Sequence, residues 1–258
     1  MTNEHFIIPP ALAISSMRDS GYKDAAHAAA ELIDNSVQAG LALEGTTQVE
    51  LLCVDATDVV NQRESTRINK IAVYDNASGM DADTLRIALQ FGAGTHRDPS
   101  AQDGIGKFGM GLPNSSISQC RHVDVWSWQN GKILYTYLDI DEVENGEMVV
   151  VPVPEPATFP DEWKEIIRDD IGPHGTLVVW SNIDRCAWKR SAAFLANSEA
   201  LVGRMYRHFL EKGRVNMRLA SFHQKGHQFE TTSDRDARPN DPLGLMTNTI
   251  CEAPWDSE

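Results

Sequence analysis

The sequence has few cysteines and no long apolar run. It holds four cysteines in 258 residues, namely Cys53, Cys120, Cys186 and Cys251. They lie far apart with no CxxC pair, which argues against a zinc site and a disulfide scaffold and fits a reducing compartment. No stretch is long and apolar enough to span a bilayer, and the N-terminus lacks a signal-peptide pattern. We therefore expect a cytoplasmic protein without a membrane partner.

Basic residues are also scarce. The chain has 23 Lys and Arg against 37 Asp and Glu, a formal net charge of −14. Such a surface as a whole repels nucleic acid and anionic membranes, so the charge of this segment does not support a nucleic-acid partner, although a local basic patch remains possible. The hydrophobic content of 41% is ordinary for a globular protein, and 258 residues can bury a full core.

Hydrophobic periodicity predicts helices first and then mostly strands joined by hairpins. The expected helices are a short one before Gly21 and others at 25–40, 80–90, 112–119, 161–169 and about 192–211; the expected strands are 47–55, 67–75, 122–128, 132–140, 147–153, 175–183 and 215–222. We expect residues 56–67 to form a polar loop and the chain from Gln224 onward to be loop or partly disordered. This order predicts an α+β fold, in which helices cover one face of a mixed sheet.

The stretch 25–40 is the most informative helix. Its polar side chains gather into one narrow stripe at 3.6 residues per turn: His27, Glu31, Asp34, Asn35 and Gln38. The rest of its circumference is apolar apart from serine, and Gly40 suits a left-handed C-terminal cap. Because charged groups are rarely buried without partners, the stripe suggests a bound ion or ligand, with Asn35 as an Mg²⁺ ligand and Glu31 as a base. The alternative is a polar network that ties this helix to its neighbours.

A second candidate is Asp75, which ends a predicted strand and precedes the turn 76–79. A carboxylate there can accept a hydrogen bond from an exocyclic amine such as adenine N6, and Gly79 lets the backbone approach a flat ring. The alternative is an ordinary Asx turn. Gly175 and Thr176 begin a strongly apolar strand, and the Thr176 hydroxyl could share a water with Asp75 and a purine edge.

The segment 91–111 shows no periodicity and contains six glycines. Loops of this length inside a compact domain are usually lids or binding loops. A flexible linker is the alternative, but Phe108 and Met110 among the glycines disfavour it.

Residues 104–111 open a predicted helix with glycines that free successive backbone N–H groups, an arrangement that binds phosphate. Lys107 could add a charge to the outermost phosphate. The letters also satisfy GxGxxG, but the dinucleotide-binding motif requires a preceding strand, and the sequence of residues 95–103 shows no strand pattern. No Gly-Lys-Ser/Thr completes a Walker loop.

Together these pieces resemble the four ATP-binding boxes of the GHKL ATPase superfamily, which includes type II topoisomerases, the large heat-shock chaperone, histidine kinases, MutL and MORC proteins. The boxes are Glu31–Ser36, Asp75–Gly79, Gly104–Gly111 and Gly175-Thr176. The order of the boxes is specific even though each box alone is not. The glycine-rich segment looks closest to the MORC-like and chaperone-like branch.

The resemblance implies a Bergerat fold, a two-layer α+β sandwich that holds ATP and Mg²⁺ between the helices and a mostly antiparallel sheet. Glu31 would be the general base and Lys107 a second catalytic residue, with Asn35 as the metal ligand. The nucleotide contacts that it implies are Asn35, Asp75, Gly79, Met80, Gly104, Gly106, Lys107, Phe108, Gly109, Met110, Gly111 and Thr176. We expect an ATP-binding domain over 1–222, with an N-terminal arm at 1–21 and an ATP lid at 91–111, and a polar tail or the start of a transducer domain at 223–258.

The expected function is slow Mg²⁺-dependent ATP hydrolysis that closes the lid and joins two protomers. Glu31 favours it, because histidine kinases of this fold lack a carboxylate there. The alternative is a nucleotide-gated interaction module with little or no turnover; a protein kinase comes third. Two residues depart from the family pattern: Ala77 replaces a usual glycine, and Gln38 stands where relatives often have Asp. Several branches take a further catalytic lysine from a following domain, so this segment could be catalytically incomplete.

Overall fold

The computed structural model describes residues 9–60, 63–92, 111–246 and 248–251. Its helices are α1 (Pro10–Asp19), α2 (Ala25–Leu41), α3 (Ala82–Ala88), α4 (Gly111–Ile117), α5 (Ile140–Glu144), α6 (Asp161–Lys164), α7 (Ser191–Met205) and α8 (Arg207–Glu211). Its strands are β1 (Thr47–Val60), β2 (Arg63–Asp75), β3 (Cys120–Gln129), β4 (Lys132–Asp139), β5 (Glu155–Pro156), β6 (Gly175–Ile183), β7 (Val215–Lys225) and β8 (Gln228–Asp236).

The strands form one mixed sheet in the order β5-β4-β3-β6-β2-β1-β7-β8. β1 and β7 pair in parallel and the other neighbours pair antiparallel. The β3–β4 hairpin turns at Asn130 and Gly131, whose φ angles of 51° and 73° are those of the two-residue turn that Asn-Gly predicts. The predicted α+β fold with a mostly antiparallel sheet is therefore confirmed.

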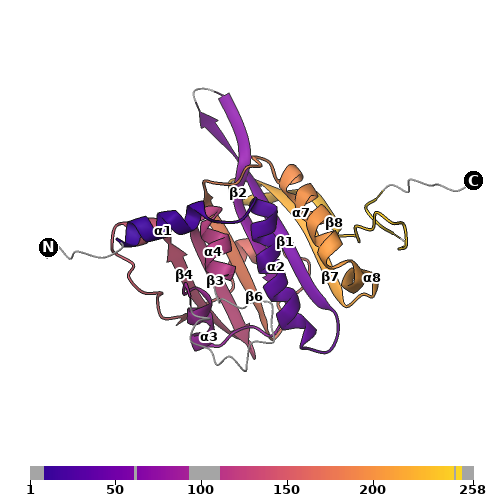
Figure 1. The fold of residues 1–258 in the computed structure, drawn as a ribbon, viewed down its shortest axis with the longest axis horizontal. Helices are drawn as coiled ribbons and strands as arrows, with labels where there is room; N and C mark the ends of the chain where they lie inside the picture. The colour runs from indigo at the N-terminus through magenta and orange to yellow at the C-terminus, as the bar shows by residue number, and fades with distance from the viewer. Residues whose placement is uncertain (1–8, 61–62, 93–110, 247, 252–258) are drawn as a thin grey trace, which may run out of the picture.

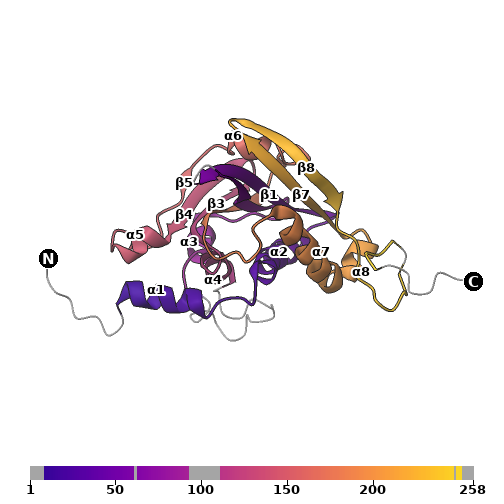
Figure 2. The same cartoon turned by 90° about the horizontal axis from the view of Figure 1, so that it is seen from above.

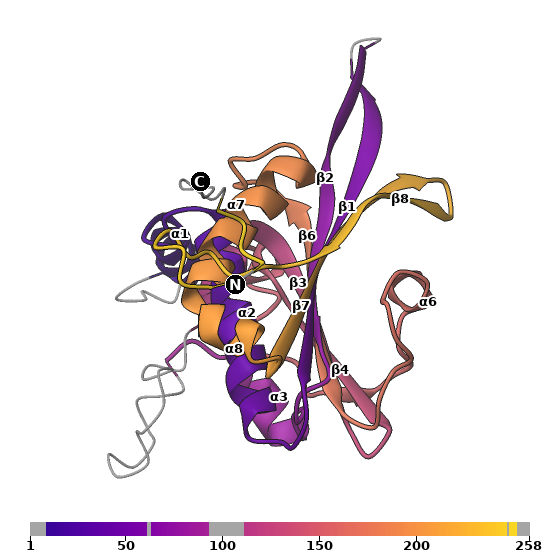
Figure 3. The ribbon, with the colours of Figure 1, turned by 90° about the vertical axis from the view of Figure 1, so that its right-hand side faces the viewer.

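One face of the sheet carries α2, α4 and α7, and the short helix α6 lies across the other face (Figures 2 and 3). The main core is on the helical face, where Ile33, Val125 and Phe194 are fully buried. On the opposite face, α6 and its flanking loop bring Phe159 and Trp163 against part of the sheet. The helical layer is thus the one that can form a site together with the sheet.

The expected loop at 56–67 is wrong, because residues 56–60 belong to β1 and residues 63–67 to β2, and the two strands pair as a long hairpin. The pairing runs from Val49 with Asp75 to Val60 with Arg63. The registers of β1 with β7 and of β2 with β6 stop at Asp55 and Ile71, and the outer part of the hairpin projects from the sheet (Figure 1). A projecting ribbon needs no apolar face, so its polar sequence lacked the alternation by which strands are recognised.

Three other expectations near the sheet edges are also wrong. Residues 228–236 form β8 instead of loop, paired with β7 over its whole length. The strand expected at 147–153 is replaced by the two-residue β5, and prolines, which cannot donate to a ladder, are frequent there. The helix expected over 192–211 is interrupted at Tyr206. The division into 1–222 and 223–258 stays a prediction, and the β7–β8 hairpin spans that border.

Gly40 does not cap α2 as expected, because the helix continues to Leu41. A Cβ atom at Gly40 would collide with the side chain of Thr47 at the start of β1. The glycine is therefore needed for the close approach of helix and strand rather than for a left-handed turn.

Candidate functional site

Asp75 is the last residue of β2, and this residue is only 4% exposed. Ser36 Oγ, from the middle of α2, donates to Asp75 Oδ2 at 2.6 Å, and the Ala77 backbone N–H donates to Oδ1 at 2.9 Å. A carboxylate has about four lone-pair positions, so this group can accept further hydrogen bonds. Burial raises the pKa of Asp75 to about 6, although hydrogen bonds from Ser36 and the backbone of Ala77 and Thr176 oppose the shift.

The residues that follow Asp75 form a turn, Asn76–Met80, which packs against the ends of β3 and β6. Gly79 adopts a φ of 62°, and a Cβ atom there would collide with the backbone oxygen of Trp128. The Met80 N–H donates to Ser127 Oγ at 2.8 Å, and this hydroxyl lies 3.1 Å from Thr176 Oγ1. The structure therefore brings Asp75, Gly79, Met80 and Thr176 together.

The polar stripe on α2 is the second part of the site. His27, Glu31 and Asp34 are half-buried, whereas Asn35 and Gln38 are exposed, so the stripe faces outward from the core. Asp34 is bound to protein: it accepts a 2.6 Å bond from Tyr206 Oη and another from the Gln38 amide. The expected alternative, a network with neighbouring elements, therefore holds for Asp34.

Glu31 lies against the N-terminal end of α4. A Cβ atom at Gly111 would collide with Glu31 Oε1, so the glycine leaves room for this carboxylate. Burial raises the pKa of Glu31, the charge of Asp34 raises it further, and a hydrogen bond with Tyr22 opposes them. A raised carboxyl pKa increases the proton affinity of the group, which suits a general base.

The donor set fits a magnesium ion that keeps most of its waters. Asn35 offers one neutral oxygen on the exposed side of α2, and Glu31 lies one turn before it. Magnesium commonly binds proteins through one or two oxygens and retains several waters. The described part of the chain has no group of three His, Cys, Asp or Glu residues that could hold a metal by itself.

Several predicted site residues lie outside the described part of the chain: Gly104, Gly106, Lys107, Phe108, Gly109 and Met110. Of the glycine-rich segment, the structure describes Phe91, Gly92 and Gly111. The roles given to this segment therefore stay predictions.

Sequence reasoning missed four side chains around the turn and its carboxylate, namely Ser36, Ser127, Gln129 and His174. Ser36 had a usable signal, because a hydroxyl on the apolar side of a helix needs a partner. The other three had none, since their partners come from segments distant in sequence.

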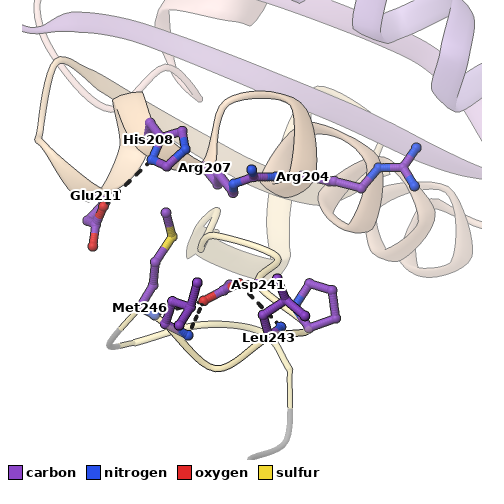
Figure 4. A pocket seen from close by; sticks show the side chains of 9 residues that line it. Arg204, Arg207, His208, Glu211, Asp241, Leu243 and Met246 are labelled. Carbon is purple, nitrogen blue, oxygen red and sulfur yellow. Dashed lines mark hydrogen bonds and ion pairs between the residues drawn. The ribbon is translucent and has the colours of Figure 1, made fainter.

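A hollow between α8 and the loop 241–246 lies apart from these residues (Figure 4). The carboxylate of Asp241 there accepts hydrogen bonds from the backbone N–H groups of Leu245 and Met246, at 2.6 and 2.7 Å. This carboxylate therefore stabilises the loop to which it belongs. Within the described ranges, no helix combines the length and the apolar character needed to cross a membrane.

Comparisons with known proteins identify the family of the chain. The family model described as "Histidine kinase-, DNA gyrase B-, and HSP90-like ATPase" matches residues 22–173, more than half of the chain, and includes Glu31, Asn35 and Asp75. The chain is also similar to Protein MICRORCHIDIA 6 of Arabidopsis thaliana, with 28% identity over 208 residues. That match covers 64% of this chain and 29% of the plant protein. The chain therefore belongs to the histidine kinase-, DNA gyrase B- and HSP90-like family of ATPases, with a MORC protein among its relatives.

Proposed function

We propose that this chain binds ATP together with Mg²⁺ and hydrolyses it slowly, and that ATP closes the 91–111 segment and joins two protomers. Family membership suggests ATP binding in general terms. The observation that carries the proposal for this chain is the buried Asp75 carboxylate, held at a strand end beside the close-packed Gly79. Burying an ionisable group is costly, so a carboxylate kept there favours a ligand that donates to it.

In this proposal Asp75 accepts a hydrogen bond from the adenine amine, while Gly79, Met80 and Thr176 line the base. Asn35 holds the metal, which supplies charge stabilisation to the phosphates. Glu31 takes a proton from the attacking water, and its position against Gly111 places it beside the end of the glycine-rich segment. Gly104, Gly106, Phe108, Gly109 and Met110 cap the phosphates, and Lys107 neutralises the terminal one. Phosphoryl transfer to water needs mainly positioning and charge stabilisation, which these groups supply.

The test compares steady-state ATP hydrolysis by the wild type and Glu31→Ala, with ATP affinity measured by calorimetry. Removing a general base typically lowers the rate on the order of 10²–10⁴-fold. We expect that loss with unchanged affinity. If both proteins bind ATP and hydrolyse it equally slowly, the chain is instead a nucleotide-gated interaction module.

Lid closure and dimerisation have their own test. A non-hydrolysable ATP analogue should protect residues 92–111 from protease and shift the sedimentation coefficient toward that of a dimer. Asn35→Ala, which should weaken Mg²⁺-ATP binding, serves as the control for both effects. Equal cleavage with and without the analogue argues against a lid, and an unchanged coefficient argues against the dimer.

A further inference from the structure

We infer that His174, Gln129 and Ser127 are positioning residues that fix the turn Asn76–Met80 against the sheet and so set where a base can bind. The inference rests on the proposed function for the identity of the ligand, but not for the geometry of the turn. None of the three belongs to the boxes that point to the ATP-binding site.

The four carbonyl groups of residues 76–79 all accept hydrogen bonds from side chains outside the turn. His174 Nδ1 lies 3.0 Å from the Asn76 oxygen and 2.7 Å from the Ala77 oxygen. Gln129 Nε2 donates to the oxygens of Ser78 and Gly79, both at 3.2 Å. Buried or half-buried backbone groups need partners, and a turn between strand and helix has few of its own. Two side chains supply them, one from the last residue of β3 and one from the residue before β6.

The contacts of His174 require a proton on Nδ1. Carbonyl oxygens only accept, so Nδ1 must carry the proton that it shares between the two oxygens. His174 immediately precedes Gly175, and a Cβ atom at Gly175 would collide with the Asp75 backbone oxygen. The start of β6 is therefore held close to Asp75 by the glycine and to the turn by the imidazole.

Ser127, on β3, also holds the turn Asn76–Met80 against the sheet. Its hydroxyl accepts from the Met80 N–H at 2.8 Å and lies 3.1 Å from the Gly175 oxygen. Because Ala77 in the same turn donates to Asp75, any shift of the turn moves the carboxylate and Gly79 together. These side chains act on a bound base through the backbone rather than by touching it.

The test measures two properties of wild type, His174→Ala, His174→Asn and Gln129→Ala, with His227→Ala as control. His227 is exposed between β7 and β8, far from the turn. The first property is amide hydrogen exchange of residues 76–80 without nucleotide; the second is ATP affinity by calorimetry. We expect His174→Ala to speed exchange at Ala77 and Met80 and to weaken ATP binding about tenfold, which is the loss of one good hydrogen bond. Asparagine can place an amide near the Nδ1 position and should restore most of both properties.

Gln129→Ala should have a smaller effect of about threefold, because its hydrogen bonds are longer and exposed. Turnover of bound ATP should not change in any of these variants. Unchanged exchange in His174→Ala overturns the inference, as does faster exchange without loss of ATP affinity. A wild type that binds no ATP overturns the proposed function instead, and the exchange data then decide by themselves whether His174 holds the turn.

Discussion

Ser36 Oγ donates a 2.6 Å hydrogen bond to Asp75 Oδ2, and this bond joins the middle of α2 to the end of β2. Ser36 follows Asn35 directly in the helix, so the proposed metal ligand and the proposed adenine acceptor are linked through two adjacent residues. The link means that a base bound at Asp75 and phosphates bound beside α2 would share one rigid support.

Asp75→Asn should weaken ATP binding about 10- to 100-fold, because a hydrogen bond to a charged acceptor contributes about 1.5–3 kcal/mol. Calorimetric titration with Mg²⁺-ATP measures the loss. Asp170→Asn, which changes an exposed carboxylate, is the matched control and should bind like wild type. Full affinity in Asp75→Asn would refute the adenine assignment.

The same substitution should have an opposite effect on the stability of the nucleotide-free chain. The pKa of Asp75 is about 6 in place of 3.8, so ionising it costs about 3 kcal/mol more in the folded than in the unfolded chain. Because the pKa is raised in the folded chain, the protonated carboxyl group stabilises the fold. This contribution is fully present below pH 3.8 and is lost as the pH rises through about 6.

Asparagine cannot ionise, so the stability of Asp75→Asn relative to wild type should increase by up to about 3 kcal/mol between about pH 4 and pH 8. Urea unfolding at both pH values measures this difference. A difference that stays constant with pH would show that Asp75 ionises normally in the folded chain.

The charge of His122 should stabilise the pairing of β3 and β4, but only below alkaline pH. Its ring lies between Asp139 Oδ2 at 2.6 Å and Asp124 Oδ1 at 3.0 Å, and these partners raise its pKa to about 9. Because the pKa is raised in the folded chain, the protonated imidazole stabilises the fold. This contribution is fully present below pH 6.5 and is lost as the pH rises through about 9.

His122→Asn should therefore lower the free energy of unfolding by about 2–3 kcal/mol at about pH 6 and by much less at about pH 10. Unfolding in urea at the two pH values gives the comparison. His227→Asn, on an exposed histidine, should change little at either pH. An equal loss at both pH values would mean that packing, not charge, is what His122 contributes.

Arg18→Ala should destabilise the chain by about 3 kcal/mol or more, because it leaves partners of a buried cation unsatisfied. Arg18 is 5% exposed; it donates to the Ile117 oxygen at 2.7 Å and to Asp184 Oδ1 at 2.6 Å. Thermal unfolding measures the loss, with the exposed Arg67→Ala as control. Equal midpoints for the two variants would show that α1 is not anchored through Arg18.

Local patterns in the sequence were enough to predict much of the fold and to place several candidate residues relative to one another. The period of α2 placed Glu31 and Asn35 on one face, and the strand ending at Asp75 put that carboxylate beside Gly79. The Asn130-Gly131 turn fixed the β3–β4 hairpin, because only a few residues adopt two successive left-handed conformations. The outer hairpin of β1 and β2 and the strand β8 were missed, since exposed strands show no apolar alternation.

The residues that share a face or end a strand could be predicted, because these features depend on neighbours within one turn or one strand. The contact of Ser36 with Asp75 and the hydrogen bonds of His174 and Gln129 to the carbonyl oxygens of the turn could not be predicted. A hydroxyl, an imidazole or an amide can bond to any suitable group. Its actual partner depends on which distant segment packs beside it, and that is set by the register of the whole sheet.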